Sequence, residues 1–332
     1  MENLVDLTLH ATHRLAMPVM THPGIELMGK TVRQAVSDGT LHYEAMHLLS
    51  DRYATCAAPA IMDLTVEAEA FGATLNMPDN EIPTVVGRLV TDADSVRALK
   101  VPELTAGRLP EYIKANKLAA KNITDRPVLG SCIGPFSLAG RLYGMSEIML
   151  DIYMQPDVIT ELLEKCTELI LAYARAQKEV GDGGIIMAEP AAGLISNDDC
   201  LTFVTPYVKR VVDALQDDSF IVVLHNCGNT GACTQAMLAT GARAHHFGDK
   251  IDMLAALEQL PRDVIGMGNL SPVTVFRMGN AGEVKKATLE LLRRTADYNN
   301  FIISSGCDTP PHSPIENFDA FFEAVQEFNK EG

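Results

Sequence analysis

From about residue 125 onward, short apolar runs alternate with stretches in which apolar positions recur at helical spacing. The apolar runs predict strands with both faces buried: Pro127–Ile133, Gly184–Ala188, Phe220–His225, Ala242–Phe247, Val264–Leu270 and Phe301–Gly306. The amphipathic stretches predict helices at Asp157–Val180, Asp198–Leu215, Gln235–Thr240, Ile251–Gln259, Glu283–Tyr298 and Ile315–Glu327. This alternation predicts an α/β fold whose strands run parallel.

Two further apolar stretches, Ala54–Met62 and Thr84–Val90, bring the number of predicted strands to about eight. Eight strand–helix units favour a (β/α)8 TIM barrel. The alternative is an open doubly wound sheet, but no G-x-G-x-x-G segment follows any predicted strand. We therefore expect a single domain over residues 1–332, with the barrel at 50–332 and residues 1–49 as a short N-terminal elaboration or lid.

Charge and composition exclude several classes of protein. The 332 residues include 27 Lys and Arg against 43 Asp and Glu, and the net charge of −16 repels nucleic-acid phosphates. The seven cysteines are odd in number and scattered, unlike a secreted disulfide framework. The N-terminus lacks the pattern of a signal peptide, and no apolar run reaches the roughly 18 residues of a transmembrane helix. We expect a cytoplasmic protein with no nucleic-acid or membrane partner.

Polar and metal-binding residue types stand where the predicted strands end. They are Glu189, His225, Cys227, His246, Asp249, Asn269 and Cys307. In a parallel barrel the C-terminal strand ends share one face, and that face carries the active site. We therefore expect these side chains to converge, with His246, Asp249 and Asn269 binding substrate. The five histidines before residue 50 are expected at the surface or in a lid.

His225 and Cys227 are two residues apart, so on an extended backbone their side chains point the same way. Imidazole and thiolate ligands suit zinc, and Cys307 after the last strand is the natural third ligand. The other five cysteines are assigned to the core, where cysteine is common. Three protein ligands leave a fourth position open, which is typical of catalytic zinc. His246 and Asp249 are alternatives for that position or for support of the ligands.

Four segments carry recognisable motifs. Gly134–Gly140 is similar to a G-P-F-[ST]-x-A-[GS] segment, and Met62–Ala70 to a D-x-T-x-E-A-E-A stretch. Leu224–Gly228 is similar to L-H-x-C-G, and Ser305–Asn317 to a closing G-C-x-x-P…P-x-E-N. With these motifs the chain resembles the uroporphyrinogen decarboxylase superfamily. Within it, the chain resembles the zinc- and corrinoid-dependent methyltransferase branch, which includes O-demethylase methyltransferases and methylcobalamin:coenzyme M methyltransferases.

The resemblance implies a (β/α)8 barrel in which His225, Cys227 and Cys307 hold zinc. It also implies that a partner protein carries the corrinoid, and this chain has no D-x-H-x-x-G segment of the kind that anchors cobalt. Glu189 stands where the family has a carboxylate and would orient substrate or donate a proton; a solvated loop acid is the alternative. Asp63 lies in a matched motif and would line the pocket, with helix capping as the alternative.

Two departures from the family pattern bear on the reaction. Residues 19–24 replace the arginine-bearing R-Q-A-G-R segment with which decarboxylases bind porphyrin carboxylates, which makes decarboxylation a remote alternative. A non-catalytic tetrapyrrole-binding barrel is equally remote, because the metal-binding residues are present. The P-V-D-x-V-P motif of thiol methyltransferases is also missing.

The predicted reaction therefore moves a methyl group from an aromatic methyl ether to the cobalt of a corrinoid protein. A thiol or tetrahydrofolate as methyl acceptor, with the corrinoid protein as donor, is the alternative. The expected partners are the corrinoid protein and a small molecule, and a homodimer is compatible with the sequence.

Overall fold

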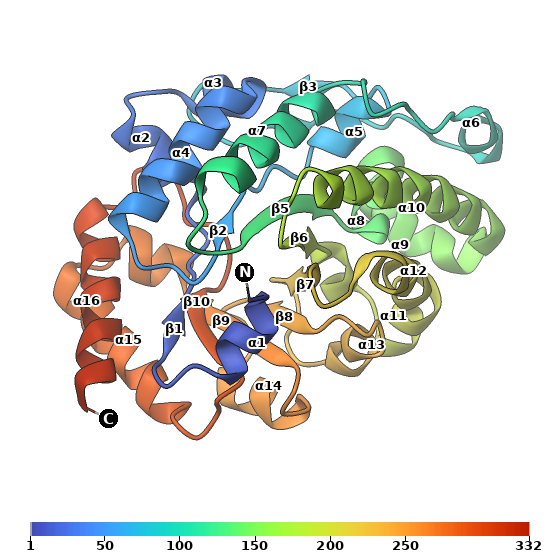
Figure 1. The fold of residues 1–332 in the computed structure, drawn as a ribbon. Coiled ribbons are helices and arrows are strands. Elements are labelled where there is room, and N and C mark those ends of the chain that lie inside the picture. Colours follow the sequence, from blue (N-terminus) through green and yellow to red (C-terminus); the bar gives the residue numbers. More distant parts are fainter. Residues whose placement is uncertain (1, 332) are drawn as a thin grey trace.

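The structure is a computed structural model that describes residues 2–331. Eight parallel strands form one sheet: β1 (Leu15–Ala16), β2 (Ala58–Pro59), β5 (Val128–Ile133), β6 (Gly184–Ala188), β7 (Ile221–Asn226), β8 (Ala244–Phe247), β9 (Ile265–Leu270) and β10 (Phe301–Ser305). Their order is β1-β10-β9-β8-β7-β6-β5-β2, and its two ends meet where the Cys56 N–H donates to the Ala16 carbonyl at 3.0 Å. The expected (β/α)8 barrel is therefore confirmed (Figure 1).

The strands are surrounded by helices that return the chain to the next strand (Figure 1). These are α4 (Gly39–Arg52), α7 (Leu109–Asn122), α10 (Pro156–Glu179), α12 (Thr205–Leu215), α13 (Thr234–Leu238), α14 (Met253–Gln259), α15 (Ala281–Arg294) and the final α16 (Ile315–Glu331). None of the helices within residues 2–331 is long and apolar enough to cross a membrane.

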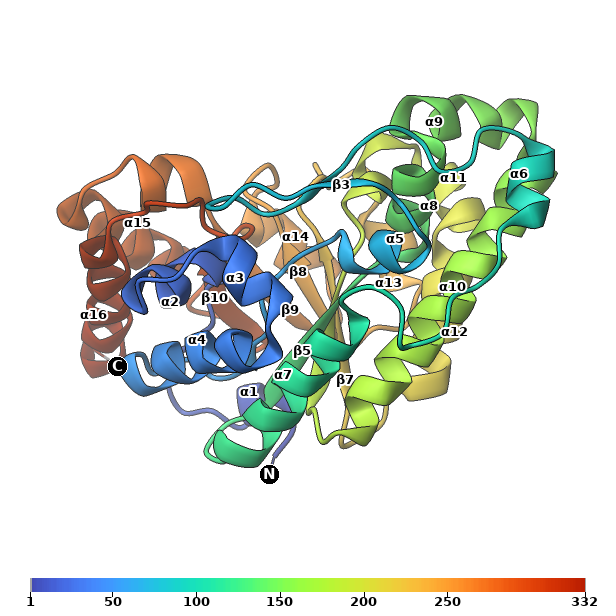
Figure 2. The same ribbon diagram turned by 90° about the horizontal axis from the view of Figure 1, so that it is seen from above.

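Shorter elements fill the connections that leave the C-terminal strand ends. They are α2 (Thr21–Leu27), α3 (Val32–Ser37), α5 (Val66–Ala70), α6 (Ala93–Ala98), α8 (Pro135–Tyr143), α9 (Met145–Met154), η1 (Pro190–Leu194), α11 (Asn197–Phe203) and η2 (Pro272–Arg277). At the opposite end of the barrel lies α1 (Leu4–Leu9) (Figure 2). Its Leu4 and Val5 are fully buried against inward-facing residues such as Ile221, so α1 closes the N-terminal end.

One predicted strand differs from the structure, and one barrel strand was not predicted. Within Thr84–Val90 only β4 (Thr84–Val85) is extended, and it pairs antiparallel with β3 (Leu75–Asn76) outside the barrel. The eighth barrel strand is instead β1, from the segment that was expected to be an elaboration outside the barrel. Two residues are too few to show a strand period, so the sequence pattern does not reveal β1.

The alternation of side chains along each strand decides which residues face the barrel interior. On β7, Ile221 and Val223 belong to the interior core, which places His225 and then Cys227 on the inward side at the C-terminal end. On β6, Ile186 is the inward residue. Glu189 is three positions further along and consequently points out of the barrel.

Arg14 anchors the short strand β1 to the end of the chain. Its backbone N–H donates to Asn329 Oδ1 at 2.7 Å, and Asn329 Nδ2 donates back to the Arg14 carbonyl at 3.0 Å. Its guanidinium donates to four backbone carbonyls: those of Thr295, Ala296, Tyr298 and Phe301. Hydrogen bonds made by the Arg14 and Asn329 side chains therefore compensate for the few backbone hydrogen bonds that the two-residue strand β1 can make.

Replacing Arg14 by alanine is expected to lower the free energy of unfolding by about 3 kcal/mol, since hydrogen bonds from a charged donor to half-buried carbonyls are lost. Urea unfolding followed by circular dichroism measures the change. The control is Arg97→Ala, which removes an exposed pair with Asp94 on one helix turn and is expected to cost less than about 0.5 kcal/mol. Equal effects of the two substitutions would contradict the anchoring role.

Candidate metal centre

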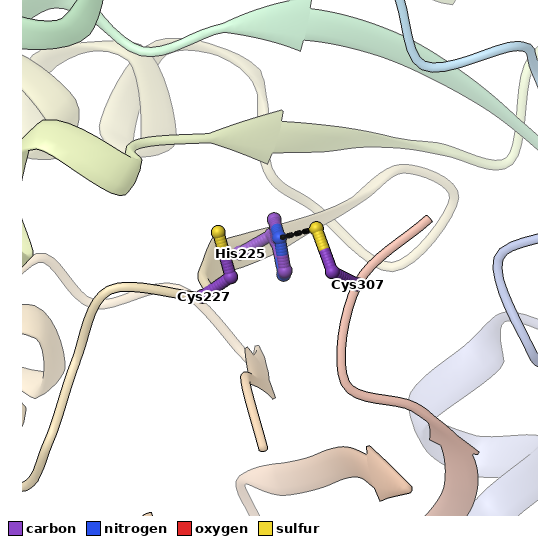
Figure 3. Close-up of side chains that lie close together, drawn as sticks. All are labelled: His225, Cys227 and Cys307. Carbon is purple, nitrogen blue, oxygen red and sulfur yellow. Dashed lines mark hydrogen bonds between the residues drawn. The ribbon is translucent and has the colours of Figure 1, made fainter. Parts of the chain in front are cut away.

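Three side chains from two distant strands meet at the C-terminal end of the barrel (Figure 3). His225 is on β7, Cys227 directly follows β7, and Cys307 lies two residues after β10. Their ligand atoms all lie within 4.8 Å of one another, and Cys307 Sγ is 3.7 Å from His225 Nε2. His225 is buried, whereas both cysteines are partly exposed toward the mouth of the barrel.

This donor set fits zinc. With Zn–S near 2.3 Å and Zn–N near 2.0 Å, a tetrahedral site separates sulfur from nitrogen by about 3.5 Å, close to the observed 3.7 Å. The hydrogen bond from the Cys307 thiol to the Cys227 sulfur, together with His225, lowers the pKa of Cys227, and the same contact raises the pKa of Cys307. One cysteine is thus poised as a thiolate, the form that binds metal.

A chain of hydrogen bonds fixes the orientation of His225. Ser304 Oγ donates to the Met17 carbonyl at 2.7 Å and therefore accepts from Nε2–H of His246 at 2.8 Å. Nδ1 of His246 is then an acceptor, and it receives the Nδ1–H of His225 at 2.7 Å. The remaining lone pair of His225, on Nε2, faces Cys307. Metal-binding histidines are commonly oriented by such a partner on the second ring nitrogen.

Two of the three residues predicted to bind substrate have other contacts, and the third is exposed. His246 is only 1% exposed, and both of its ring nitrogens are engaged in the chain of hydrogen bonds. Asn269 is partly buried, and its Nδ2 donates to the carbonyls of Gly248 and Ile251, which holds the connection after β8. Asp249 is exposed in that same connection. These contacts support the metal ligands and the rim of the site.

Glu189 is fully buried, and its carboxylate points at the start of α8. It accepts from the backbone N–H groups of Phe136 (3.0 Å) and Ser137 (2.6 Å), and from the Ser137 hydroxyl. Burial raises the pKa of Glu189 to about 7, although these hydrogen bonds lower it. The solvated loop acid that was the alternative interpretation is thereby ruled out, and the visible role of Glu189 is to satisfy the first turn of α8.

Asp63 is also enclosed. Its Oδ2 accepts from Arg108 Nη1 at 2.5 Å, and its Oδ1 accepts from the backbone and hydroxyl of Thr65. Arg108 donates further to Glu69 Oε2 at 2.6 Å. Asp63 therefore joins the turn before α5 to the start of α7, and its side chain is 0% exposed.

Two buried groups near the mouth carry no signal that the sequence pattern alone could interpret. Glu67 lies within the Met62–Ala70 motif; its Oε1 accepts from the Ile133 N–H at 2.9 Å, and its Oε2 has no partner within residues 2–331. Burial raises the pKa of Glu67 to about 8.

His22, which was expected at the surface or in a lid, is buried, with Nδ1 2.8 Å from the Thr309 carbonyl. His42 is buried as well, so a surface position is wrong for these two histidines.

The whole barrel, and not the metal-binding motifs alone, matches a known family. A model of the uroporphyrinogen decarboxylase (URO-D) family matches residues 3–328. The chain belongs to this family. The URO-D match thus includes α1 and β1, the segment that sequence patterning had left outside the barrel.

Several relatives of this URO-D protein are named methyltransferases. Methylcobamide:CoM methyltransferase MtbA of Methanosarcina mazei is 31% identical over 270 residues, which cover 80% of this chain and 78% of that protein. Methylcobamide:CoM methyltransferase MtaA of Methanosarcina barkeri is 26% identical over 312 residues, or 92% and 86% of the two chains. A uroporphyrinogen decarboxylase of Coxiella burnetii is 25% identical over 290 residues, or 84% and 79%.

A solved structure has the same fold as this URO-D barrel. It is a methyltransferase from Methanosarcina mazei, with a TM-score of 0.88 and 23% sequence identity over 97% of each chain. At this identity the likeness bears on the fold, and it agrees with the closed eight-stranded arrangement found here.

Loss of the His246 acceptor is expected to weaken metal binding at the His225 centre of this URO-D protein. His246→Leu leaves Nδ1–H of His225 without a partner, and such changes typically weaken binding 10- to 100-fold. Competition with a chromophoric zinc chelator measures the dissociation constant. His246→Asn, whose Oδ1 takes the place of the Nδ1 acceptor, is expected to recover part of the affinity. Unchanged zinc affinity of His246→Leu would disprove the orienting role.

Glu67 is expected to make the folded state less stable as the pH rises. Its pKa is about 8 when folded and near 4.5 when unfolded, so the unfolded chain loses this proton first. The free energy of unfolding should then fall between about pH 4.5 and pH 8, by about 1.4 kcal/mol per unit of pKa difference. Glu67→Gln should flatten this slope in urea unfolding, whereas the exposed Glu44→Gln should not. Parallel slopes for all three proteins would refute the assignment.

Proposed function

We propose that this chain is a zinc-dependent methyltransferase that moves a methyl group from the cobalt of a corrinoid protein to a thiol. The observation that supports the proposal most directly is the convergence of His225, Cys227 and Cys307 within 4.8 Å at the C-terminal end of the barrel. This is the end at which TIM-barrel enzymes carry their active sites. Relatives that are named methylcobamide:CoM methyltransferases supply the reaction class.

The three residues suit activation of a thiol by their charge as well as their geometry. Zinc held by them would supply the positive charge that lowers the pKa of a thiol substrate toward neutrality. Neutral His225 and two cysteine thiolates offset the +2 charge of the ion, so the sulfur of a further thiol keeps its negative charge and its nucleophilicity. The partial exposure of Cys227 and Cys307 leaves the side of the centre that faces the mouth accessible to that thiol.

The names of the relatives favour a thiol as the methyl acceptor. The sequence alone had favoured an aromatic methyl ether as the methyl donor, because the P-V-D-x-V-P motif is missing. Besides the two methylcobamide:CoM methyltransferases, a relative from Methanosarcina mazei is named methylated-thiol--coenzyme M methyltransferase, and it is 24% identical over 286 residues. No name among these three describes an ether. Decarboxylation of a porphyrin remains disfavoured, because the segment at residues 19–24 offers no arginine to its carboxylates.

The proposal predicts that the zinc-loaded protein demethylates free methylcobalamin when coenzyme M is added. The spectral change from methylcobalamin to the cob(I)alamin product follows the reaction under anaerobic conditions. Cys307→Ala should bind less than one zinc per chain and lose at least about 100-fold in rate, because a ligand to the activating charge is missing.

Two comparisons complete this test. Cys166→Ala, which removes a buried thiol on α10 far from the centre along the chain, should retain zinc and most of the rate. In the reverse assay, cob(I)alamin is incubated with a methoxybenzoate. Formation of methylcobalamin there, without transfer to any thiol in the forward assay, would replace the thiol proposal by ether demethylation.

A further inference from the structure

Large apolar side chains are exposed on one end of the molecule. Among residues 2–331 nine such side chains are exposed: Leu27, Val86, Leu150, Tyr153, Met154, Leu194, Leu201, Val273 and Met278. Each of the nine lies in a connection that leaves the C-terminal end of a strand and precedes the helix that returns to the other end. The metal centre opens at this end, so the apolar surface and the candidate active site share one face of the protein.

Five of the nine side chains form a patch on neighbouring elements, here called the α9–α11 patch: Leu150, Tyr153 and Met154 of α9, Leu194 of η1 and Leu201 of α11. The three residues of α9 are spaced i, i+3, i+4 and so share one helix face, with exposed fractions of 61%, 65% and 70%. Figure 2 shows α9 and α11 at the same end of the barrel, opposite α1.

Hydrogen bonds join the two parts of the α9–α11 patch. Tyr153 Oη donates to Asp199 Oδ2 at 2.5 Å, and Ser196 Oγ donates to the same oxygen at 2.6 Å. Asp199 therefore holds the end of α9 against the start of α11 and against the turn that carries Leu194. Contiguous apolar surface of this kind, rimmed by polar groups, commonly marks an interaction site.

The rim of the α9–α11 patch is acidic. Residues 145–157 and 190–203 contain five acidic residues and no lysine or arginine. They are Glu147, Asp151, Asp157, Asp198 and Asp199. Glu189, which precedes the second segment, is buried and does not contribute to the rim. A second copy of this chain would set acidic rim against acidic rim, which is unfavourable at a net charge of −16. The surface suits a partner with an apolar centre and a basic rim.

We propose that the α9–α11 patch is the surface on which the corrinoid protein docks. This inference rests on the proposed function, which requires a protein-borne cobalt to approach His225, Cys227 and Cys307 through the mouth of the barrel. The patch lies on the connections after β5 and β6, and the connections after β9 and β10 remain for the small thiol to enter.

A comparison of two methyl donors tests the docking surface. One donor is a methylated corrinoid protein from the same organism, and the other is free methylcobalamin, which needs no protein docking. The double variant Tyr153→Ser/Met154→Ser should raise KM for the corrinoid protein at least tenfold, because truncated apolar anchors dominate loss of affinity. The rate with free methylcobalamin should stay within about twofold.

Controls separate this patch from the rest of the rim and from the chemistry. Met278→Ser changes a side chain that is 74% exposed at the same end but outside the patch, and it should leave both KM values unchanged. Asp157→Lys/Asp198→Lys should raise KM for the corrinoid protein and reduce its dependence on salt.

Two outcomes would overturn the docking proposal. One is an unchanged KM for the corrinoid protein in the Tyr153→Ser/Met154→Ser variant. The other is a change of oligomeric state in that variant, measured by analytical ultracentrifugation; this would assign the patch to a second copy of the chain. Failure of the proposed function has a different signature, since the unmodified protein would then not demethylate free methylcobalamin at all. Direct binding of the corrinoid protein to the patch variants, measured by calorimetry, still tests docking in that case.

Discussion

Closure of the barrel depends on β1 and β2, each only two residues long. The Cys56–Ala16 hydrogen bond joins them, and without it β10 and β5 would lie near open edges of the sheet. Arg14 and Asn329 supply the bonds that so short a strand cannot make with its neighbours. β7 and β10 belong to one continuous run of this curved sheet, and His225 and Cys307 meet at its C-terminal end.

Strand alternation then divides the strand-end residues into two groups. Residues in step with the interior core, such as His225, Cys227 and His246, lie at the metal centre or directly against it. Glu189 is out of step by one position, and it satisfies the first turn of α8 from outside the barrel. A shift of one residue therefore separates a candidate metal ligand from a helix-supporting carboxylate, although both lie at the ends of strands of similar composition.

The sequence pattern predicts the six long strands to within one or two residues, because continuous apolar runs are a strong signal where both faces are buried. It does not reveal β1, which is too short to show a period. It also predicts a barrel strand at Thr84–Val90, where the structure has only β4, which pairs with β3 in a separate hairpin. The grouping of His225, Cys227 and Cys307 follows from spacing and strand ends. The partners of His246, Glu189 and Asp63 depend on which helix or strand packs opposite, which no local pattern encodes.

The chain of hydrogen bonds from His225 ends on the carbonyl of Met17, next to β1, while the third sulfur comes from Cys307 near the other end of the sequence. A nascent chain therefore cannot assemble this donor set until Cys307 has been synthesised and β10 has met β7. Loading of a metal at this candidate centre would accordingly follow the synthesis of Cys307. Partly folded chains would offer an incoming ion only the His225–Cys227 pair.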